Sequence, residues 1–534
     1  MLADEKVRKQ ALEPDQSFIV QAPAGSGKTE LLIQRYLKLL GLANFPEEIL
    51  AMTFTRKAAA EMKERILSAL TIAQTRPCPE QMHAKLTWKL AQKVLEQNEL
   101  RQWQLMDNPA RLRIVTIDSF CSSLTRRMPL LSRMGTNLDI QENAKNLYRE
   151  TARIILSLTE NETNPYGELV RNILRHIDNS KEDFIKRIVQ LLEKRDQWMI
   201  SFFDPRDNLE THPLNDSARQ DLEQTMAGLI QSRMGELQDL FCPEIQQKIL
   251  QIANYSGRNI DNPSHPCACL ANLLSFPDTT IDSLKIWKGL AHLFLTQDKL
   301  PAYRKQANVK LGFPLGKNDE AKKMKNEFVQ LVDSLQENPT LLPALARVKK
   351  LPRGHFTDSE WDLLKSTIRL LAEINKSLKK VFSSRQITDF TEISLSAING
   401  LIHRDENGQE RPTDLLFYLD CKIHHFLVDE YQDTSYKQEE LLHKLTAEWS
   451  DGDGKTLFIV GDPKQSIYRF RDAEVGLFIK IQKRGLGSLR LKTLALESNF
   501  RSQKHLVDWV NTCFQKIFPK HNDPNLGAIS YSES

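Results

Sequence analysis

The stretch SFIVQAPAGSGKT, residues Ser17–Thr29, decides the fold of this chain. It begins with the short apolar run Phe18–Val20, which is typical of a buried strand, and continues into a loop of small residues. The next segment, Glu30–Leu40, has apolar residues at helical spacing and predicts a helix, with Gly41 expected in the left-handed conformation that often ends one. A strand, a glycine loop and a helix in this order are the context of a phosphate-binding P-loop, and they predict an α/β domain.

The loop fits the P-loop pattern as A-x-x-x-x-G-K-T, with Ala22 at the position where the usual pattern begins with Gly. In such a loop the backbone N–H groups point at phosphate oxygens, and the start of the helix adds a partial positive charge. Lys28 can reach the β- and γ-phosphates, and the Thr29 hydroxyl can bind Mg²⁺. A loop that only joins a strand to a helix is the alternative interpretation. The residues predicted to bind the nucleotide are Ala22, Pro23, Ala24, Gly25, Ser26, Gly27, Lys28 and Thr29.

The composition indicates a large globular chain. Its 534 residues suggest about three or four domains. The net charge of +4, from 73 basic and 69 acidic residues, is too small to argue for nucleic acid by itself. The 7 cysteines are scattered and do not suggest a disulfide framework. The sequence contains no signal-peptide segment and no apolar run long enough to cross a bilayer, so a cytoplasmic location without membrane contact is expected.

Further apolar runs predict more strands of the same sheet, at residues 48–55, 113–117, 426–430, 457–460 and 493–496. In open α/β sheets, ligands bind at the edge formed by the carboxyl ends of the strands. At the first of these ends, Thr55 is a plausible N-cap for a helix that begins at Arg56. The Thr55 hydroxyl, Arg56, Lys57 and the helix start form a candidate site for a nucleic-acid phosphate. The side chain of Phe54 packs in the core or stacks on a base, and both interpretations stay open.

Paired carboxylates, Asp429 and Glu430, follow the strand at 426–430. Together with a P-loop they supply the minimum for hydrolysis of a nucleoside triphosphate. Asp429 is predicted to share a Mg²⁺ ion with Thr29, and Glu430 is predicted to orient and deprotonate the attacking water. A surface turn is the alternative interpretation of the two carboxylates.

Between about residue 126 and residue 384 the sequence loses its strand patterns. Helical periodicity at Asn146–Leu158, Glu168–Ile177 and Phe184–Trp198 predicts a large helical insertion within the α/β domain. Its basic residues form either a solvated surface or a basic face along DNA; they are Lys305, Lys310, Lys317, Lys322, Lys323, Lys325, Lys349, Lys350 and Arg353. A helix is expected at His505–Phe518, and the polar tail Asn522–Ser534 is expected to be unanchored.

Six motifs follow one another along the chain, at Ala22–Thr29, Thr53–Glu61, Thr116–Phe120, Val428–Asp433, Val460–Phe470 and Asn499–Ser502. On these motifs the chain resembles a superfamily 1 DNA helicase of the UvrD/RecB type, and it is most similar to the helicase part of RecB- and AddA-like helicase–nuclease subunits. The string VDEYQDT at Val428–Thr434 is close to that family's V-D-E-x-Q-D-T. The resemblance implies an α/β fold: a RecA-like P-loop NTPase motor domain with a parallel sheet, a large helical insertion of the 1B type, and only the start of a second RecA-like domain.

The resemblance also implies domain boundaries. The first motor domain, 1A, is expected at residues 1–127 and 385–490, the 1B-like insertion at 128–384, and the start of the second motor domain, 2A, at 491–534. The later motifs of the second domain and a nuclease domain are not found in the sequence, so the chain is expected to be the N-terminal portion of a larger protein. We expect such a portion to bind ATP and, weakly, DNA, without unwinding a duplex by itself.

Roles for single residues follow from the resemblance where the residues match the family's motifs. It implies that Gln465 contacts the γ-phosphate and relays its presence to the DNA site, and that Arg501 is an arginine finger. Phe500 is implied to stack on the adenine, and Tyr468 and Phe470 on bases of single-stranded DNA. The expected catalytic residues are Lys28, Glu430, Gln465 and Arg501. The expected DNA-contacting residues are Phe54, Thr55, Arg56, Thr116, Tyr468 and Phe470.

The chain departs from the family pattern at several of these positions. Arg56 stands where relatives usually have Asn, Asp118 where they have His, and Phe470 where they have Trp. An acidic Asp118 would repel a phosphate, whereas Phe470 keeps an aromatic ring. For the family's adenine-reading Gln, Gln10 is the nearest candidate.

The sequence therefore predicts an ATP-dependent DNA helicase or translocase, with Mg²⁺ and ATP as cofactors. Family resemblance adds 3′→5′ polarity, action on single-stranded and duplex DNA in recombinational double-strand break repair, and a partner protein of the AddB or RecC kind. The alternative is a partial motor that binds ATP and single-stranded DNA, or a partner, without unwinding. A P-loop kinase or transporter ATPase would leave Gln465–Phe470 and Asn499–Ser502 unexplained.

Overall fold

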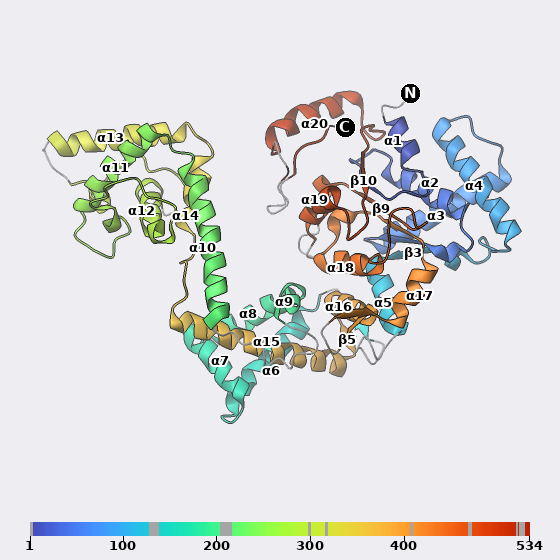
Figure 1. Cartoon of the computed structure of the whole chain (residues 1–534), viewed down its shortest axis with the longest axis horizontal. Coiled ribbons are helices and arrows are strands. Elements are labelled where there is room, and N and C mark those ends of the chain that lie inside the picture. The colour runs from blue at the N-terminus through green and yellow to red at the C-terminus, as the bar shows by residue number, and fades with distance from the viewer. Residues whose placement is uncertain are drawn as a thin grey trace. The chain divides into compact units, whose positions relative to one another are not determined.

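The computed structural model describes residues 4–127, 138–141, 143–202, 216–296, 301–314, 319–405, 409–467, 473–519, 522 and 529–533. The chain divides into two compact units (Figure 1). The sheet unit comprises Met1–Leu158, Ser180–Asp204 and Glu373–Ser534, and the helical unit comprises Thr159–Asn179 and Pro205–Ala372. Each unit has a hydrophobic core of its own.

A parallel sheet of six strands forms the centre of the sheet unit. Its strands run in the order β10-β1-β9-β8-β2-β3, and every neighbouring pair is parallel. The strands are β1 (Phe18–Gln21), β2 (Ile49–Thr53), β3 (Arg113–Thr116), β8 (His425–Val428), β9 (Thr456–Gly461) and β10 (Lys492–Ala495). The predicted α/β fold with a parallel sheet is confirmed, and each predicted strand is present with bounds that differ by only a residue or two.

Helices cover both faces of this sheet. Successive residues of a strand point to opposite faces, so a strand of apolar residues contributes to a hydrophobic core on each face. In β1, Phe18 and Val20 belong to one hydrophobic core and Ile19 belongs to the other. The first core is covered by α2 (Lys28–Leu40), α3 (Arg56–Thr75) and α4 (Met82–Leu100) (Figure 1). The second core is covered by α5 (Ile117–Arg127), α16 (Phe390–Leu401), α17 (Asp414–Lys422), α18 (Tyr436–Leu445) and α19 (Val475–Arg484). Since all six strands are parallel, their carboxyl ends meet at one edge of the sheet.

The end of α2 differs from the prediction. Gly41 follows the helix with φ −69° and ψ −4°, which are right-handed values, so the expected left-handed cap is wrong. The N–H of Gly41 donates to the carbonyl of Leu37 and continues the helical turn by one residue. A Cβ atom at this position would come no closer than 3.4 Å to its nearest neighbour, the Leu37 carbonyl oxygen, so the turn does not require glycine.

Part of the region expected as one insertion belongs to the sheet unit. The helices α6 (Lys145–Ser157) and α8 (Lys181–Glu193) pack against each other there, and α9 (Arg195–Phe202) follows α8. The predicted helical run at 184–198 is thus two helices. The long helix α15 (Asp358–Arg385) has residues in both units.

A buried charge pair attaches this part of the chain to α16. Arg195 is fully buried, and its Nη1 lies 2.8 Å from Oδ2 of Asp389, the residue that caps α16. The Tyr148 hydroxyl donates to the same oxygen at 2.6 Å, and the N–H of Glu392 donates to Oδ1 at 2.8 Å. Burial would raise the pKa of Asp389, but Arg195 and these hydrogen bonds hold the pKa below its ordinary value. The pair therefore stays charged and fixes where α16 begins.

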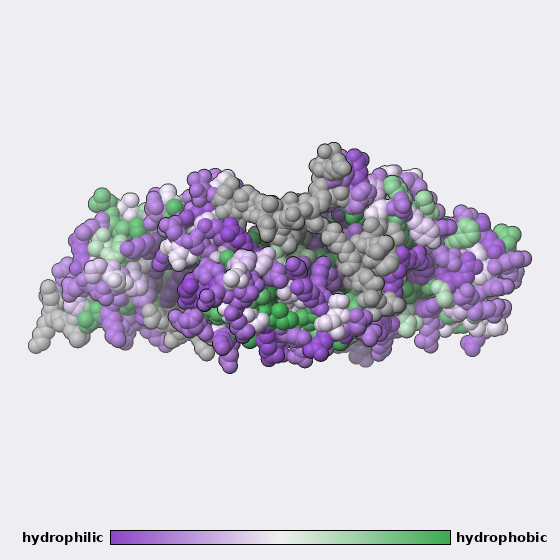
Figure 2. Space-filling model, turned by 90° about the horizontal axis from the view of Figure 1, so that it is seen from below, coloured by the Kyte–Doolittle hydropathy of each residue, from purple (hydrophilic) through white to green (hydrophobic). Residues whose placement is uncertain are grey.

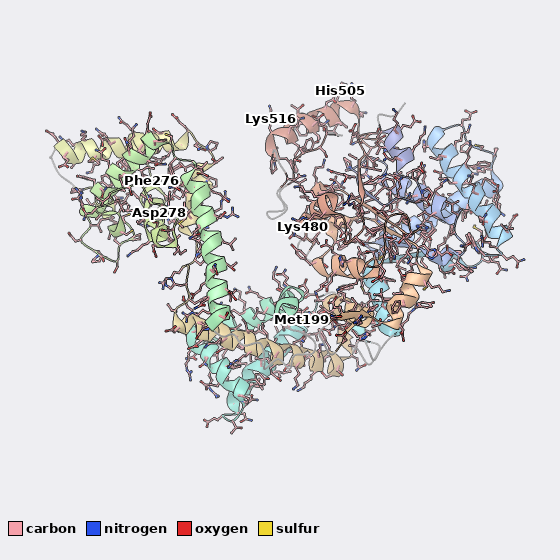
Figure 3. All side chains as sticks on the ribbon, in the orientation of Figure 1. Met199, Phe276, Asp278, Lys480, His505 and Lys516 are labelled. Atoms are coloured by element: carbon pink, nitrogen blue, oxygen red, sulfur yellow. The ribbon has the colours of Figure 1, made fainter. Side chains whose placement is uncertain are left out.

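The helical unit is built around an aromatic cluster. Trp287 is fully buried, its ring centroid lies 5.3 Å from that of Phe276, and its indole N–H donates to the carbonyl of Asp278 at 2.7 Å (Figure 3). Phe241 adds a second ring contact to Phe276 at 5.6 Å. The helices of the unit are α7 (Pro165–His176), α10 (Asp216–Gln238), α11 (Pro243–Arg258), α12 (Leu284–Phe294), α13 (Asp319–Gln336) and α14 (Leu341–Lys349).

Short elements complete the described chain. The remaining helices of the sheet unit are α1 (Glu5–Gln10) and α20 (Lys504–Ile517), the second close to its predicted position. The small strands are β4 (Asp139–Ile140), β5 (Ile387–Thr388), β6 (Ile402–Arg404) and β7 (Glu410–Pro412). The 3-10 helices are Pro46–Glu48, Pro109–Arg111, Leu158–Glu160, Ala268–Leu270, Ile281–Ser283, Val309–Leu311, Tyr431–Asp433 and Pro463–Gln465.

The tail is anchored where the structure describes it, so that prediction is wrong for residues 529–533. The Tyr531 ring stacks at 6.0 Å on Phe514 of α20, and its hydroxyl donates to Asn511 at 2.7 Å. The Lys464 ammonium donates to the Ser532 carbonyl at 2.9 Å. An aromatic side chain and a lysine from the sheet unit thus hold a polar segment that has no hydrophobic periodicity of its own.

The surface of the chain is mainly polar. On the face drawn in Figure 2, hydrophobic side chains gather only in small patches. No helix among the described residues has both the length and the apolar character needed to span a membrane. Five of the lysines singled out in the helical region, Lys305, Lys310, Lys322, Lys323 and Lys350, are exposed, and Lys317 lies outside the described residues. Exposure fits both a solvated surface and a DNA-facing one.

Candidate functional site

The P-loop lies at the carboxyl edge of the sheet, between β1 and α2. Gly25 and Gly27 have φ values of 82° and 76°, which L side chains rarely adopt, and Gly27 directly precedes the first turn of α2. Ala22, in the place of the usual Gly, is fully buried in the hydrophobic core, and its N–H donates to the Gly461 carbonyl of β9 at 2.9 Å. The departure from the usual pattern therefore adds a core contact and leaves the loop intact.

Lys28, the first residue of α2, reaches the carboxylates that follow β8. Its ammonium contacts the carboxylate of Glu430 and lies 3.7 Å from Oδ1 of Asp429. The side chains of Lys28 and Asp429 are only 13% and 12% exposed, so the charges face each other rather than water. The structure thus brings together the P-loop lysine and the two carboxylates that the sequence places far apart.

The backbone around the two carboxylates is unusual. The N–H of Asp429 donates to the Met52 carbonyl of β2 at 2.9 Å, and burial raises the pKa of Asp429 to about 6, with Lys28 lowering it and Glu430 raising it. Glu430 has φ 54° and ψ 42°, a left-handed conformation that is rare for a residue other than glycine. Its N–H donates to Oδ1 of Asp429 at 2.9 Å. Such strained conformations gather at functional sites.

Sequence reasoning missed Gln432, which links Glu430 to the end of β9. Its Nε2 donates to Oε2 of Glu430 at 2.6 Å, and its Oε1 accepts the N–H of Asp462 at 3.0 Å. Asp462 in turn accepts a hydrogen bond from Nε2 of Gln465 at 2.6 Å. A chain of hydrogen bonds therefore connects Glu430 with Gln465. The signal for it in the sequence is the Gln of VDEYQDT, together with Gly461, where a Cβ would lie 2.5 Å from Oε1 of Gln432.

The segment after β10 packs directly on the P-loop. The N–H of Phe500 donates to the Gly25 carbonyl at 2.8 Å, and Nδ2 of Asn499 donates to the Ala24 carbonyl at 3.2 Å. A Cβ on Gly25 would lie 2.6 Å from the Asn499 side chain and 2.9 Å from Cβ of Arg501. The structure thus brings Phe500 and Arg501 beside the P-loop, with both side chains exposed.

The expected DNA-contacting residues at β2 and β3 occupy neighbouring strand ends. Thr53 of β2 is the register partner of Thr116 of β3, which is buried and whose hydroxyl donates to Ser119 at 2.7 Å. Thr55 caps α3 as predicted, because its hydroxyl oxygen accepts the Ala58 N–H at 3.1 Å. Arg56 is exposed at the start of α3 and Phe54 is half-buried. Tyr468 and Phe470 lie outside the described residues.

Asp118, one of the departures from the family pattern, has a partner within the protein. Nε2 of Gln438 donates to its Oδ1 at 3.4 Å. Asp118 also belongs to the first turn of α5, where the helix dipole favours a negative charge. A carboxylate here therefore has a structural explanation that involves no phosphate.

Observations on the P-loop and the strand ends test whether these residues fit a nucleotide with Mg²⁺. Ser26 is 2% exposed, and its Oγ has no hydrogen-bond partner among the described residues, so the hydroxyl can accept or donate a bond to a ligand. Sites of this kind hold Mg²⁺ with one or two protein oxygens together with the phosphates of the nucleotide. Asp429, and the Thr29 hydroxyl next to Lys28, are oxygen donors of the right type. The residues present fit the group.

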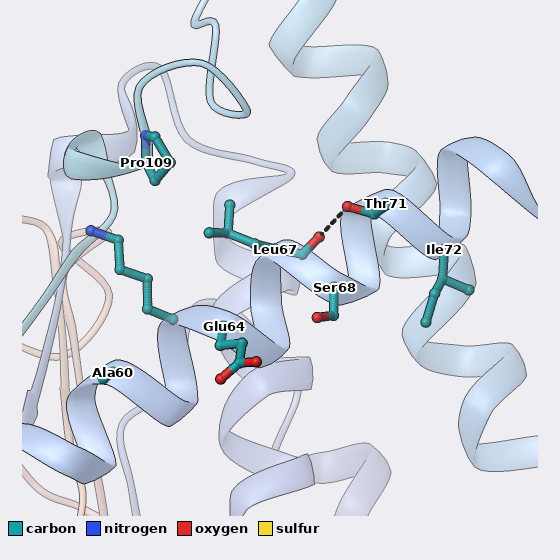
Figure 4. Close-up of a pocket in the computed structure, with 8 residues that line it drawn as sticks. Ala60, Glu64, Leu67, Ser68, Thr71, Ile72 and Pro109 are labelled. Atoms are coloured by element: carbon teal, nitrogen blue, oxygen red, sulfur yellow. Dashed lines mark hydrogen bonds between the residues drawn. The ribbon is translucent and has the colours of Figure 1, made fainter.

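A shallow surface hollow lies elsewhere on the sheet unit, along one face of α3 and beside Pro109 (Figure 4). The Thr71 hydroxyl at its rim donates to the Leu67 carbonyl of the same helix at 2.9 Å. None of the residues predicted to bind nucleotide or DNA lines this hollow. It is therefore distinct from the candidate site at the strand ends.

A doubly covered parallel sheet, with a P-loop after β1 and paired carboxylates after β8, defines the class of P-loop nucleotide-binding domains. The chain belongs to the family described as UvrD/REP helicase N-terminal domain, whose model matches residues 3–485.

Curated relatives are similar to the chain along almost its whole length. It is 26% identical over 536 residues to an ATP-dependent helicase/nuclease subunit from Oceanobacillus iheyensis, with 97% of this chain and 39% of the relative covered. It is 26% identical over 552 residues to the protein of the same name from Bacillus pumilus, with the same coverage. The chain thus spans about two fifths of the length of these relatives.

Proposed function

We propose that the chain is the ATP-hydrolysing motor part of a DNA helicase or translocase with 3′→5′ polarity, acting on single-stranded and duplex DNA in recombinational double-strand break repair. The observation that carries the proposal is the contact of Lys28 with Asp429 and Glu430 at the carboxyl edge of the sheet. Membership of the UvrD/REP family supports a helicase, and the relatives named as ATP-dependent helicase/nuclease subunits support its dependence on ATP.

The residues at this edge have distinct roles in the proposed hydrolysis. Lys28 exchanges its two carboxylate partners for the β- and γ-phosphates of ATP. Thr29 and Asp429 would hold Mg²⁺, which neutralises phosphate charge. Glu430, released by Lys28 and held by Gln432, orients the attacking water and accepts its proton. Arg501 would add positive charge next to the transferred phosphoryl group.

The proposed coupling to DNA runs through the end of β9. Gln465 is connected to Glu430 by the hydrogen bonds of Gln432 and Asp462, so a change at the phosphate has a bonded route to the segment that follows. In the sequence, Tyr468 and Phe470 follow Gln465 within five residues. We propose that single-stranded DNA is contacted by Phe54, Thr55, Arg56, Thr116, Tyr468 and Phe470, with the aromatic rings stacking on bases.

The domain assignment is part of the same proposal. Residues 1–127 and 385–490 form motor domain 1A, the helical region within 128–384 is a 1B-like insertion, and the segment from 491 leads into domain 2A. β10 (Lys492–Ala495) follows residue 490 but pairs with β1 of domain 1A, and this pairing favours moving the boundary between 1A and 2A from residue 490 to the end of β10. A partner of the AddB or RecC kind and a cytoplasmic location complete the proposal.

The test is ATP hydrolysis by purified residues 1–534, with and without single-stranded DNA, beside the variant Glu430→Gln. We expect hydrolysis that DNA stimulates and that the variant loses. Hydrolysis that continues unchanged in Glu430→Gln would contradict the assigned base. An ATP-dependent strand-separation assay on a tailed duplex then distinguishes a helicase from a partial motor that binds ATP and DNA without unwinding.

A further inference from the structure

An ion pair at the start of α1 has no role in the function proposed so far. Nε of Arg8 donates to Oδ1 of Asp4 at 3.0 Å, and Nη2 donates to Oδ2 at 2.9 Å, so the two planar groups meet through two parallel bonds. The Asp4 side chain is 1% exposed and that of Arg8 is 16% exposed. A second pair with the same spacing on the same helix, Glu5 and Lys9, is exposed to water, with Lys9 72% exposed.

Each member of the buried pair reaches a different part of the nucleotide site. Asp4 accepts hydrogen bonds from the N–H of Glu497 at 3.2 Å and from the N–H and hydroxyl of Ser498 at 3.2 and 2.8 Å. Burial would raise the pKa of Asp4, but the bonds from Arg8 and Ser498 hold the pKa below its ordinary value. Asp4 therefore stays charged and fixes the backbone that leads to Phe500.

Arg8 bonds the P-loop and the aromatic ring at the same time. Its Nη2 donates to the Ser26 carbonyl at 2.6 Å, and its guanidinium carbon lies 5.3 Å from the centroid of the Phe500 ring, within cation–π distance. The edge of the Phe500 ring would lie 3.4 Å from a Cβ on Gly27.

Three successive P-loop carbonyls accept hydrogen bonds from α1 or from the segment that follows β10. The carbonyl of Ala24 accepts from Asn499 at 3.2 Å, that of Gly25 from the Phe500 N–H at 2.8 Å, and that of Ser26 from Arg8. The P-loop is therefore held against the Phe500 segment through its carbonyl groups, whereas a P-loop binds phosphates through its backbone N–H groups. Removing Arg8 would remove both the hydrogen bond from α1 to the Ser26 carbonyl and the contact of α1 with the Phe500 ring.

The other end of α1 is fixed to the helix that begins with Lys28. Arg35 of α2 is fully buried and donates to the carbonyls of Ala11 at 3.1 Å and Gln16 at 3.0 Å, and also to those of Glu13 and Pro14. Because α1 is anchored at its end by Arg35, Asp4 and Arg8 are held in register with the P-loop. The position of Phe500 thus depends on α1.

We propose that Asp4 and Arg8 are positioning residues that hold the Phe500 ring where the base of a bound nucleoside triphosphate stacks. The pair then determines affinity for the base and leaves affinity for the triphosphate almost unchanged. This inference rests on the proposed nucleotide function of the site.

The experiment compares two probes on the purified chain with Mg²⁺ by titration calorimetry: a non-hydrolysable ATP analogue, which carries a base, and inorganic tripolyphosphate, which does not. For Arg8→Ala we expect the dissociation constant of the analogue to rise roughly tenfold, and that of tripolyphosphate to change by less than about twofold. Phe500→Ala should have the same selective effect, and adding Arg8→Ala to it should have no further effect. Lys9→Ala is the matched control and should leave both affinities unchanged.

Two other outcomes would contradict the positioning role of Asp4 and Arg8. Equal weakening of both probes in Arg8→Ala would show a general support of the P-loop, and unchanged binding of both would show no role. If Arg8→Ala does not fold, Asp4→Asn keeps the shape of the pair and removes the charge, and it must show the same selective loss of the analogue. Failure of the unmodified chain to bind either probe would instead overturn the proposed nucleotide function.

Discussion

The sheet unit and the helical unit differ in how completely their buried polar groups are paired. Among the described residues, the helical unit has one buried side-chain atom without a hydrogen-bond partner, Oγ1 of Thr296, and all the others lie in the sheet unit. Two of them, Ser26 and Asp433, lie in the P-loop and just after the paired carboxylates. Unpaired buried polar atoms cost stability, so these two mark places where a bound ligand can supply the missing hydrogen-bond partner.

The pKa of Asp433 in the candidate site and that of Asp278 in the helical unit shift in opposite directions. Burial raises the pKa of Asp433 to about 6, with Ser466 lowering it and Glu430 raising it, so acidic groups in the site are pushed towards their neutral forms. In the helical unit, Asp278 instead accepts hydrogen bonds from the Thr280 and Ser283 hydroxyls, both at 2.6 Å, and these bonds lower its pKa. The candidate site thus keeps a strained Glu430 backbone and carboxyl groups of raised pKa, whereas Asp278 is held charged by hydrogen bonds from neighbouring residues.

The largest expected effect is the loss of ATP hydrolysis when Lys28 is removed from the sheet unit. In Lys28→Ala the two carboxylates lose their shared cation, and the phosphates lose theirs, so we expect ATP hydrolysis to fall by roughly 10²–10³-fold. Steady-state hydrolysis measures the change, and Lys38→Ala at the end of the same helix is the control. Hydrolysis within a few-fold of the unmodified chain would mean that the chemistry lies elsewhere.

Trp287→Ala tests whether the helical unit is stabilised by its own core, separately from the sheet unit. Loss of a fully buried indole and of its hydrogen bond to Asp278 should destabilise the helical unit by about 3–5 kcal/mol. Because the nucleotide residues all belong to the sheet unit, affinity for ATP should stay the same. Hydrogen exchange followed by peptide mass spectrometry should show faster exchange in residues 216–296. Equal acceleration in β1 and β8 would contradict two separately stabilised units.

Gln432→Ala should have a smaller effect, confined to turnover. The variant leaves the Glu430 carboxylate without its bond from Nε2 and the Asp462 N–H without its acceptor, so we expect kcat to fall roughly 10–100-fold. KM for ATP should change little, because Gln432 acts on Glu430 rather than on the P-loop. The control is Gln438→Ala, whose side chain bonds Asp118 instead. A raised KM with normal kcat would show that Gln432 supports binding rather than catalysis.

The parts of this site that were predictable are the ones encoded in short stretches. Hydrophobic periodicity identified the strands, and the P-loop and the Asp429–Glu430 pair follow strands as motifs of adjacent residues. Parallel pairing then brings their ends to one edge, which is why Lys28 and the carboxylates could be expected to meet. The capping of α3 by Thr55 was predictable for the same local reason.

The parts that were missed depend on contacts between distant segments. Asp4 meets Ser498 only because β10 lies beside β1, and nothing in the sequence near either residue indicates the contact. Gln432 belongs to a quoted motif, but its role depends on the N–H of Asp462 at the end of the neighbouring strand. The predicted left-handed cap at Gly41 was wrong because glycine only permits this conformation. Whether a helix end adopts it depends on the packing around that end.

The smallest predicted effect is a pH dependence of stability in the sheet unit. His425 of β8 is mostly surrounded by protein and bonds Oγ1 of Thr456 through Nδ1 at 2.8 Å; burial lowers its pKa to about 3, with the charges of Arg35 and His424 acting in the same direction. The unfolded chain protonates this histidine near pH 6.5 while the folded chain does not, so stability from this group is lost as pH falls below 6.5. Between pH 6.5 and pH 5 the loss is about 2 kcal/mol.

Denaturant unfolding at a series of pH values measures this loss of stability. In His425→Asn the loss should be smaller by about 2 kcal/mol. His505 is an exposed histidine on α20 (Figure 3), so His505→Asn should keep the full loss. An identical pH dependence in His425→Asn and the unmodified chain would mean that this ring titrates equally in both states.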